Sequence, residues 1–467
     1  MEILYTVWVF AKVIAAVLLL FGAAVFVHEF GHFWVARRLG MKVEAFAIGF
    51  GPKIFSWTRD GIEYSWRWIP AGGFVKLPQM ISSELLEGSS EGEQIAPASP
   101  WTRILVAFAG PFMNVVFAFV IATLIYFTGL PVVVDPPIVG AVDVESREGQ
   151  LGIIAGDLVV EVDGEEVKTW QEVTIQTVLA RTNMIPVVFE RDGVRHEYVL
   201  QARVNDHFEW KILNLNPSGH PGIMEVIAGA AASEAGLEPG DLVLFFAGMP
   251  ISSQTQLIEL IQKNGADTAE IEVQRAEQVL SFSVTPRIDS ASGRAMIGVM
   301  LGTNSAQIYE VKKPGPSPFA QIAEVWKKTV QTLGALVHSK QTGVGVKDLS
   351  GPPGILAMLA REVLTDFRLA LSFLVLLNVN LAIINLLPIP LLDGGHIVMA
   401  LIEKLARRPL SVRLVEYTTA FFALLLISFM LYVSFNDVKR WSRFKSMFQV
   451  ETEVQERRGT GNSEVAP

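Results

Sequence analysis

The sequence predicts an α-helical integral membrane protein with four transmembrane helices, a membrane-associated β-hairpin and two inserted α+β domains. Three observations support this fold class. Hydrophobic residues make up 51% of the 467 residues and charged residues only 18%, a balance that is unusual for a fully soluble chain. Four apolar runs reach the roughly 20 residues that a helix needs to cross a bilayer. A more polar segment between the second and third runs contains an internal repeat.

The composition also excludes several kinds of site. The chain has no cysteine, which rules out disulfides, thiolate zinc sites, iron–sulfur clusters and a cysteine nucleophile. Its net charge of −9 argues against a nucleic-acid partner, because such a partner requires a basic surface. Any chemistry must therefore use His, Asp, Glu, Ser or Lys side chains.

The first predicted span covers residues 7–36, and from residue 13 onward its only strongly polar side chains are His28, Glu29 and His32. A cleaved signal peptide is the alternative for this run, but the start carries Glu2 rather than a basic region, and the apolar run continues past the small residues of a possible cleavage site. The second run, from Ile104 to Leu130, contains Asn114 as its only amide and carries no charge. The four predicted spans are 7–36, 101–130, 366–400 and 412–437.

Lysine and arginine near the span ends predict the orientation, because such residues concentrate in cytoplasmic loops. The first connection, 37–103, holds eight of them and the third connection, 393–416, holds four. A basic cluster after the fourth span weakens this bias without reversing it. The long second connection is therefore expected on the exported side, with the first and third connections in the cytoplasm.

The second connection contains the internal repeat. Residues 155–164 align with residues 239–248, 84 positions later, and a helical stretch follows each copy, the first at 170–179. A Gly-Asp turn that leads into an apolar strand resembles bacterial PDZ domains, which bind extended peptides by strand addition. The sequence thus predicts two PDZ domains, at 131–215 and 216–308. Peptide binding and a role as a spacer or steric cap both remain open.

Three further segments have distinct patterns. In residues 41–80, apolar and polar side chains alternate after an Asp-Gly turn, which predicts a β-hairpin with one Trp-rich face. That face would rest on the membrane interface, dock an extended substrate, or do both. Residues 315–360 predict an amphipathic helical region at the membrane surface. Residues 82–100 have the composition of a linker, and residues 446–467 that of a disordered tail.

The strongest chemical signal is His28-Glu29-Phe30-Gly31-His32 in the first span. On a helix, positions i and i+4 share one face, so both imidazoles can bind one metal ion while Glu29 lies beside the metal's water as a base. Ionisable side chains inside a span are costly and are rarely found there without a function. Two satisfied core histidines would leave Glu29 without a partner.

A catalytic zinc site needs a third protein ligand, which here must be His, Asp or Glu. Asp393 is the preferred candidate because it lies at the end of the third apolar run, where Pro388 and Pro390 interrupt the helix. His396, three residues later, is a rival ligand. Taken alone, Asp393 could instead cap the next helix.

These residues also carry a family resemblance. His28-Glu-Phe-Gly-His32, Ala109-Gly-Pro-Phe-Met-Asn114 and Asn385-Leu-Leu-Pro-Ile-Pro-Leu-Leu-Asp-Gly394 together resemble the site-2 protease family of intramembrane zinc metalloproteases, in particular its bacterial members with two PDZ domains. The resemblance extends from about residue 7 to residue 437. It implies Zn²⁺ held by His28, His32 and Asp393, with Glu29 as the catalytic residue.

The resemblance further implies a substrate site and a substrate. Asn380 and Asn385 would shape that site, although cross-helix hydrogen bonding is the alternative for both amides. The hairpin would bind the substrate as an added strand through its glycine-rich segments, which comprise Gly49, Phe50, Gly51, Gly72 and Gly73.

The activity implied is hydrolysis of a peptide bond within the transmembrane segment of a single-pass membrane protein that another protease has already cut. An anti-sigma factor of the RseA type is such a substrate, and its cleavage would serve an envelope stress response. The implied location is the bacterial inner membrane, with periplasmic PDZ domains that filter substrates by size and an active site near the cytoplasmic side. A catalytically inactive, membrane-anchored PDZ scaffold is the alternative function.

Overall fold

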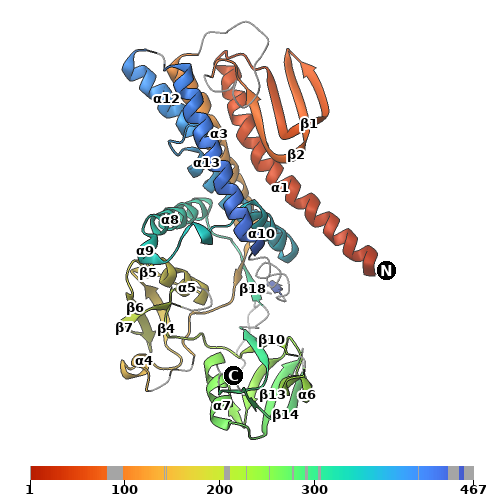
Figure 1. The fold of residues 1–467 in the computed structure, drawn as a ribbon, viewed down its shortest axis with the longest axis vertical. Coiled ribbons are helices and arrows are strands. Elements are labelled where there is room, and N and C mark those ends of the chain that lie inside the picture. Colours follow the sequence, from red (N-terminus) through yellow and green to blue (C-terminus); the bar gives the residue numbers. More distant parts are fainter. Residues whose placement is uncertain are drawn as a thin grey trace, which may run out of the picture. The chain divides into compact units, whose positions relative to one another are not determined.

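The computed structural model describes residues 2–80, 98–140, 142, 145–204, 211–227, 229–251, 253–275, 278–289, 293–302, 307–408, 410–439 and 452–456 (Figure 1). The chain divides into two compact units. The first comprises Met1–Pro131, Val311–Val330 and Leu349–Met447, and the second comprises Val132–Glu310, Gln331–Asp348 and Phe448–Pro467. Of the predicted linker, residues 82–97 lie outside the described residues, and Pro100 already begins a helix.

Helices form most of the first unit. They are α1 (Glu2–Arg38), α3 (Pro100–Thr128), the first part of α8 (Pro318–Val337), α10 (Pro352–Thr365), α11 (Phe367–Asn385), α12 (Asp393–Ala406) and α13 (Val412–Lys439). Four stretches of the described helices are long and apolar enough to cross a membrane. These are Ala11–Arg38, Pro100–Thr128, Phe367–Asn385 and Arg413–Lys439. They agree in number and approximate place with the four predicted spans.

The third predicted span, 366–400, is broken into two helices, as Pro388 and Pro390 in the sequence indicate. Helix α11 ends at Asn385, and α12 begins at Asp393. Between them, Pro388 and Pro390 cannot donate backbone hydrogen bonds, so the helical ladder cannot continue through them. The break places the first turn of α12 beside the end of α11.

Several helices of the first unit pack against α3. Its start is capped by Ser99, whose side chain accepts a hydrogen bond from the backbone N–H of Thr102, and Pro100 occupies the first turn, where no donor is needed. Helices α1, α11 and α12 all pack against α3. Apolar side chains from α1, α3 and α11 form one buried cluster, which includes Ala24, Ala118, Ile125, Leu374 and Val379.

Strands β1 (Ala45–Arg59) and β2 (Ile62–Lys76) form the hairpin beside α1 (Figure 1). Its turn lies at Asp60 and Gly61, which both have positive φ angles of 53° and 77°. Both strands bend, so residues 45–48 pair with residues 63–66 on one side and with residues 73–76 on the other. Residues 73–76 therefore lie at an edge of the sheet.

A buried ion pair joins α3 to α12. Arg103 and Glu403 form a charged hydrogen bond, and their side chains are only 7% and 6% exposed. Glu403 also accepts a hydrogen bond of 3.1 Å from the backbone N–H of Leu410. This pair anchors the far end of the helix that begins with Asp393.

We expect Glu403→Gln to destabilise the fold, because it leaves the Arg103 charge buried without its partner. Removal of one member of a buried pair costs about 3–5 kcal/mol. The matched control is Glu324→Gln, which breaks an exposed pair with Lys328 on α8 that is worth at most about 1 kcal/mol. Thermal unfolding in detergent measures both effects. Equal unfolding temperatures for the two variants would contradict the anchoring role.

The second unit contains two similar modules. The first has a sheet of order β5-β4-β6-β7, and the second has the order β14-β13-β11-β10-β17, with β12 paired to β11. The elements of the first are α4 (Arg147–Gln150), β4 (Leu158–Val162), β5 (Glu165–Glu166), α5 (Trp170–Leu179), β6 (Met184–Arg191), β7 (Val194–Gln201), β8 (Arg203–Val204) and β9 (Lys211–Ile212). Those of the second are β10 (Gly222–Val226), α6 (Ala231–Ala235), β11 (Leu242–Phe246), β12 (Met249–Pro250), α7 (Gln254–Asn264), β13 (Ala269–Arg275), β14 (Gln278–Val284), β15 (Arg287–Ile288), β16 (Ala295–Met296) and β17 (Val299–Gly302).

The repeat extends to side-chain contacts. Arg191 donates two hydrogen bonds to Asp157 in the first module, and Arg275 donates two to Asp241 at the equivalent positions 84 residues later. Burial of Asp157 raises its pKa, but the hydrogen bonds from Arg191 and from the backbone N–H of Ile154, together with nearby positive charge, outweigh burial, so the pKa lies below its usual value. The duplicated pair indicates that the two modules share one architecture.

Five short elements remain among the described residues. They are β3 (Leu130–Val133), β18 (Gln307–Lys312), β19 (Thr452–Glu456), α9 (Ser339–Thr342) and a 3₁₀ turn at Val346–Asp348. Strands β19, β18 and β3 form one sheet in that order. Part of the predicted disordered tail, 446–467, is therefore a strand, because β18 offers it a pairing edge. The rest of that tail lies outside the described residues.

Candidate metal centre and active site

Two histidines of α1 face one another across a helical turn. The Nε2 atoms of His28 and His32 lie 3.2 Å apart. His32 Nδ1 donates a hydrogen bond of 2.7 Å to the carbonyl oxygen of Val106 on α3. Since a carbonyl only accepts, the proton of the neutral ring lies on Nδ1, and Nε2 is left with a lone pair for a metal.

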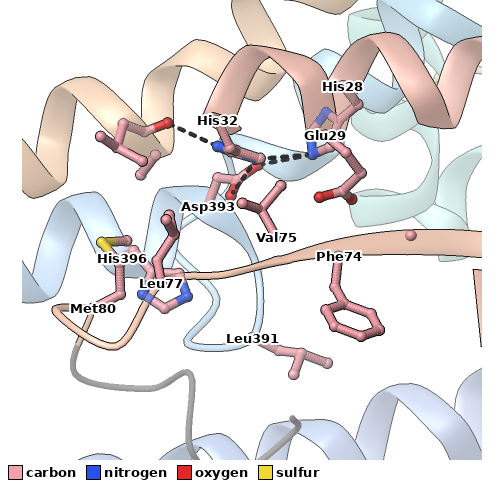
Figure 2. Close-up of a pocket in the computed structure, with 13 residues that line it drawn as sticks. His28, Glu29, His32, Phe74, Val75, Leu77, Met80, Leu391, Asp393 and His396 are labelled. Atoms are coloured by element: carbon pink, nitrogen blue, oxygen red, sulfur yellow. Dashed lines mark hydrogen bonds and ion pairs between the residues drawn. The ribbon is translucent and has the colours of Figure 1, made fainter. Parts of the chain in front are cut away.

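Asp393 brings a carboxylate to the same place. Its Oδ2 lies 3.3 Å from Nε2 of His28, and its Oδ1 lies 3.4 Å from Nε2 of His32. Figure 2 shows these three side chains directed toward one another from α1 and from the start of α12. The structure thus brings together residues that are 361 positions apart at their closest, from His32 to Asp393.

Two glycines hold Asp393 in place. A Cβ atom on Gly394 would lie 2.3 Å from the carbonyl oxygen of Leu386, and one on Gly395 would lie 2.2 Å from that of Ile389. The turn after α11 therefore packs directly onto the first turn of α12, at a distance that only glycine permits. This contact explains why two glycines follow the aspartate.

The three side chains fit a zinc ion. His28, His32 and Asp393 each offer a ligand atom, all within 4.8 Å of one another. Around a tetrahedral zinc with bonds of about 2.0 Å, ligand atoms lie about 3.3 Å apart, which matches the observed separations of 3.2 to 3.4 Å. Two imidazoles and one carboxylate are a donor set typical of catalytic zinc. Among the described residues, His396 is not part of this group.

A cavity of about 220 Å³ opens beside the three ligands. Glu29 lines it, on the same helix as the histidines, and Figure 2 shows its carboxylate directed toward β2. The opposite wall includes Gly73, Phe74 and Val75 of the sheet edge, and His396 also lines the cavity. The cavity thus combines a carboxylate, a metal-binding group and an edge strand.

Close packing of α1 on α3 positions the histidines. A Cβ atom on Gly31 would lie 2.5 Å from the carbonyl oxygen of Ala109, and one on Gly110 would lie 2.3 Å from His32 Nε2. Sequence reasoning did not assign a role to Gly110 or to the carbonyl of Val106. The feature of the sequence that indicates this close approach is the pair of small residues, Ala109 and Gly110, inside an apolar run, since such residues let helices approach closely.

The predicted substrate residues fall into two groups. Asn385 Nδ2 lies 3.4 Å from His28 Nε2, and Gly73 lines the cavity. Asn380 does not line the cavity, and its Oδ1 accepts a hydrogen bond of 2.5 Å from Thr329 on α8. The others lie within the sheet and do not line the cavity; they are Gly49, Phe50, Gly51 and Gly72.

Together, the apolar helices and the centre define the class, a membrane-spanning metallohydrolase. The model of Peptidase family M50 matches residues 16–429, so the chain belongs to peptidase family M50. Members of this family are zinc-dependent metalloendopeptidases, and the chain is accordingly an intramembrane zinc metalloprotease. Membership of this peptidase family argues against the alternative function, a catalytically inactive, membrane-anchored PDZ scaffold.

Similar proteins cover nearly the whole chain. The regulator of sigma-E protease RseP of Salmonella typhimurium is 32% identical over 458 residues, which cover 91% of this chain and 98% of that protein. The protein of the same name in Escherichia coli is 31% identical, with the same coverage. A Vibrio cholerae protein, whose name provisionally calls it a zinc metalloprotease, is also 31% identical, again with the same coverage.

A solved PDZ domain of a Listeria monocytogenes protein matches 18% of this chain and 86% of that domain, with 24% identity and a TM-score of 0.17. The four apolar helices fit a membrane protein, and the two modules repeat one sheet arrangement.

Proposed function

We propose that His28, His32 and Asp393 hold the zinc ion, that Glu29 is the catalytic base, and that the site cleaves a peptide bond within a substrate's transmembrane segment. The observation that carries this proposal is the set of ligand separations, 3.2 to 3.4 Å, beside a cavity that Glu29 lines. Bound zinc supplies Lewis acidity, which lowers the pKa of water and polarises a carbonyl. Asp393 contributes the negative charge that balances the dication.

Glu29 moves the protons. It accepts a proton from the attacking water and delivers one to the amine that leaves, since a carboxylate beside the ligand set can reach both. His32 stays oriented throughout, because its Nδ1 proton is held by the Val106 carbonyl. Asn385 lies close enough to the ligands to donate to a substrate carbonyl at the same centre.

Removal of the metal tests this assignment. Incubation of the purified protein with a strong zinc chelator should abolish cleavage of a model transmembrane substrate, and added Zn²⁺ should restore it, because no other described group in the cavity can replace the Lewis acid. Cleavage that persists after the bound zinc has been removed would contradict the proposal.

The edge of β2 is proposed to bind the substrate as an added strand. Residues 73–76 pair with residues 45–48 on one side, while Gly73, Phe74 and Val75 line the cavity that contains Glu29. A peptide bond in an intact helix is shielded, so an extended substrate segment that pairs with this edge would expose the bond to the centre.

Gly73→Ala should lower the rate of cleavage by at least about tenfold while the zinc content stays unchanged. An added Cβ would lie 2.9 Å from Glu29 Cγ and 2.9 Å from the carbonyl oxygen of Ala47, so it would displace both the base and the strand. The control is Gly22→Ala on α1, where an added Cβ meets nothing within 4 Å. Rates measured on one substrate should separate the two variants, and equal rates would exclude this role for Gly73.

The setting of the activity is proposed from the sequence and the relatives. The bacterial relatives favour an inner-membrane protein, and the basic loops favour exported PDZ domains with a site near the cytoplasmic side. Because the relatives are named regulators of sigma-E protease, a membrane-spanning anti-sigma factor of the RseA type, already cut once, is the proposed substrate. A proteomic comparison of membranes that contain wild-type or Glu29→Gln protein tests this, since the substrate should accumulate with the variant.

The PDZ pair is proposed to act as a size filter. Cleavage of substrates with progressively longer exported domains checks this. A filter predicts that the rate falls with domain length, whereas rates independent of length would favour peptide binding.

A further inference from the structure

Asn114 of α3 contacts the candidate metal centre from outside the ligand set. Its side chain is completely buried, and its Nδ2 lies 3.0 Å from Nδ1 of His28. It is the only amide in the second apolar run. A polar side chain is costly in an apolar helix, and this one lies against Nδ1 of His28, the ring nitrogen that faces away from the other two ligands.

Each of the two histidines needs a hydrogen-bond acceptor at Nδ1 if its Nε2 is to bind a metal. His28 Nε2 faces Asp393 and His32, at 3.3 and 3.2 Å, so this nitrogen must be unprotonated to bind a metal. The proton of the neutral ring then lies on Nδ1, which needs an acceptor. For His32 that acceptor is the carbonyl of Val106. For His28, the described group at hydrogen-bond distance from Nδ1 is the Asn114 carboxamide.

The orientation of this carboxamide decides the state of His28. With Nδ2 toward the ring, the amide donates, so Nδ1 must carry the lone pair and Nε2 the proton, which prevents ligation. With Oδ1 toward the ring, the amide accepts and Nε2 is free to bind. In the first orientation Oδ1 is buried without a partner among the described residues, and in the second Nδ2 takes its place. Each orientation therefore leaves one atom of the carboxamide without a partner, so this cost does not distinguish the two orientations. Only the orientation with Oδ1 toward the ring leaves Nε2 of His28 free to bind a metal.

We propose that Asn114 is a positioning residue whose Oδ1 accepts a hydrogen bond from Nδ1 of His28 when the centre holds zinc. The bond fixes the ring's tautomer and rotation, as the Val106 carbonyl does for His32. This inference rests on the proposed metal site, because it assumes that His28 is a ligand. Partners of this kind typically change metal affinity by about 10–100-fold.

Zinc affinity measured by competition with a chromophoric chelator tests the proposal. Asn114→Leu should weaken binding by about 10–100-fold. Asn114→Asp should bind zinc at least as tightly as wild type does, because a carboxylate also accepts from Nδ1. The absorption spectrum of the Co²⁺-substituted protein should be altered in the Leu variant and close to that of wild type in the Asp variant.

Asn378 on α11 provides a matched control. It is also completely buried, it donates to the carbonyl oxygen of Leu374 at 2.8 Å, and its Oδ1 has no partner among the described residues. Asn378→Leu removes a comparable buried amide without touching a ligand, so its zinc affinity should equal that of wild type.

Each outcome decides the question. Wild-type zinc affinity in Asn114→Leu, or equal losses in the Leu and Asp variants, would overturn the proposal, and so would an equal loss in Asn378→Leu. Should Asn114→Leu fail to fold, Asn114→Ala takes its place with the same expectation. His28→Ala separates this inference from the site itself. If that variant retains full affinity, the metal site is wrong; if it loses affinity and Asn114→Leu does not, only the role of Asn114 fails.

Discussion

Glu29→Gln is expected to lower the rate of peptide cleavage by about 10²–10⁴-fold while the amount of bound zinc stays the same. Glu29 lines the cavity beside the three ligand atoms but does not belong to the group that they form. A glutamine keeps the shape and polarity of the side chain but cannot accept the proton of the attacking water. The expected result is therefore a folded, zinc-loaded and inactive protein.

The measurement is a single-turnover rate on a purified transmembrane substrate, with the zinc content determined on the same sample. Glu362→Gln on α10 is the control, since this carboxylate is not among the residues that line the cavity. A Glu29→Gln protein that cleaves at the wild-type rate would remove Glu29 from the chemistry.

Asp393→Asn is expected to lower the zinc affinity by at least about 100-fold, a larger loss than that of a residue that only supports a ligand. The substitution removes the one negative charge among the three ligand groups and leaves a neutral amide to face a dication. Without Asp393, the two imidazoles of α1 would hold the metal alone, and cleavage should fall with the zinc occupancy.

His396→Ala is the informative comparison, because His396 lines the same cavity one turn further along α12. It should keep wild-type zinc affinity, since its nitrogen atoms are not part of the ligand group. Isothermal titration of the metal-free proteins separates the variants. An equal loss of affinity from both would mean that the third ligand has been misassigned.

Local patterns predicted much of this architecture. The helix expected at residues 170–179 is α5, with the same bounds, because a capping threonine and a helical apolar pattern are properties of the segment itself. The hairpin turn lies at the Asp60–Gly61 dipeptide for the same reason. The helical spacing of His28 and His32 placed both rings on one face before any tertiary contact was known.

Features that depend on distant contacts could not be predicted in this way. The double pairing of residues 45–48 is set by a bend that brings residues 73–76 back to the sheet. Asn380 bonds to Thr329, 51 positions earlier, so its partner depends on where α8 packs. The role of the Val106 carbonyl likewise follows from the approach of α3 to α1.

The most direct test of the central claim is to identify the bond that is cut. Wild-type protein reconstituted in lipid vesicles with a single-pass substrate should produce a new terminus inside the substrate's apolar segment, detected by mass spectrometry. That product should be absent with Glu29→Gln protein and after zinc removal. A cut confined to the polar flanks of the substrate, or one that persists in the Glu29→Gln vesicles, would contradict intramembrane cleavage at the His28, His32 and Asp393 centre.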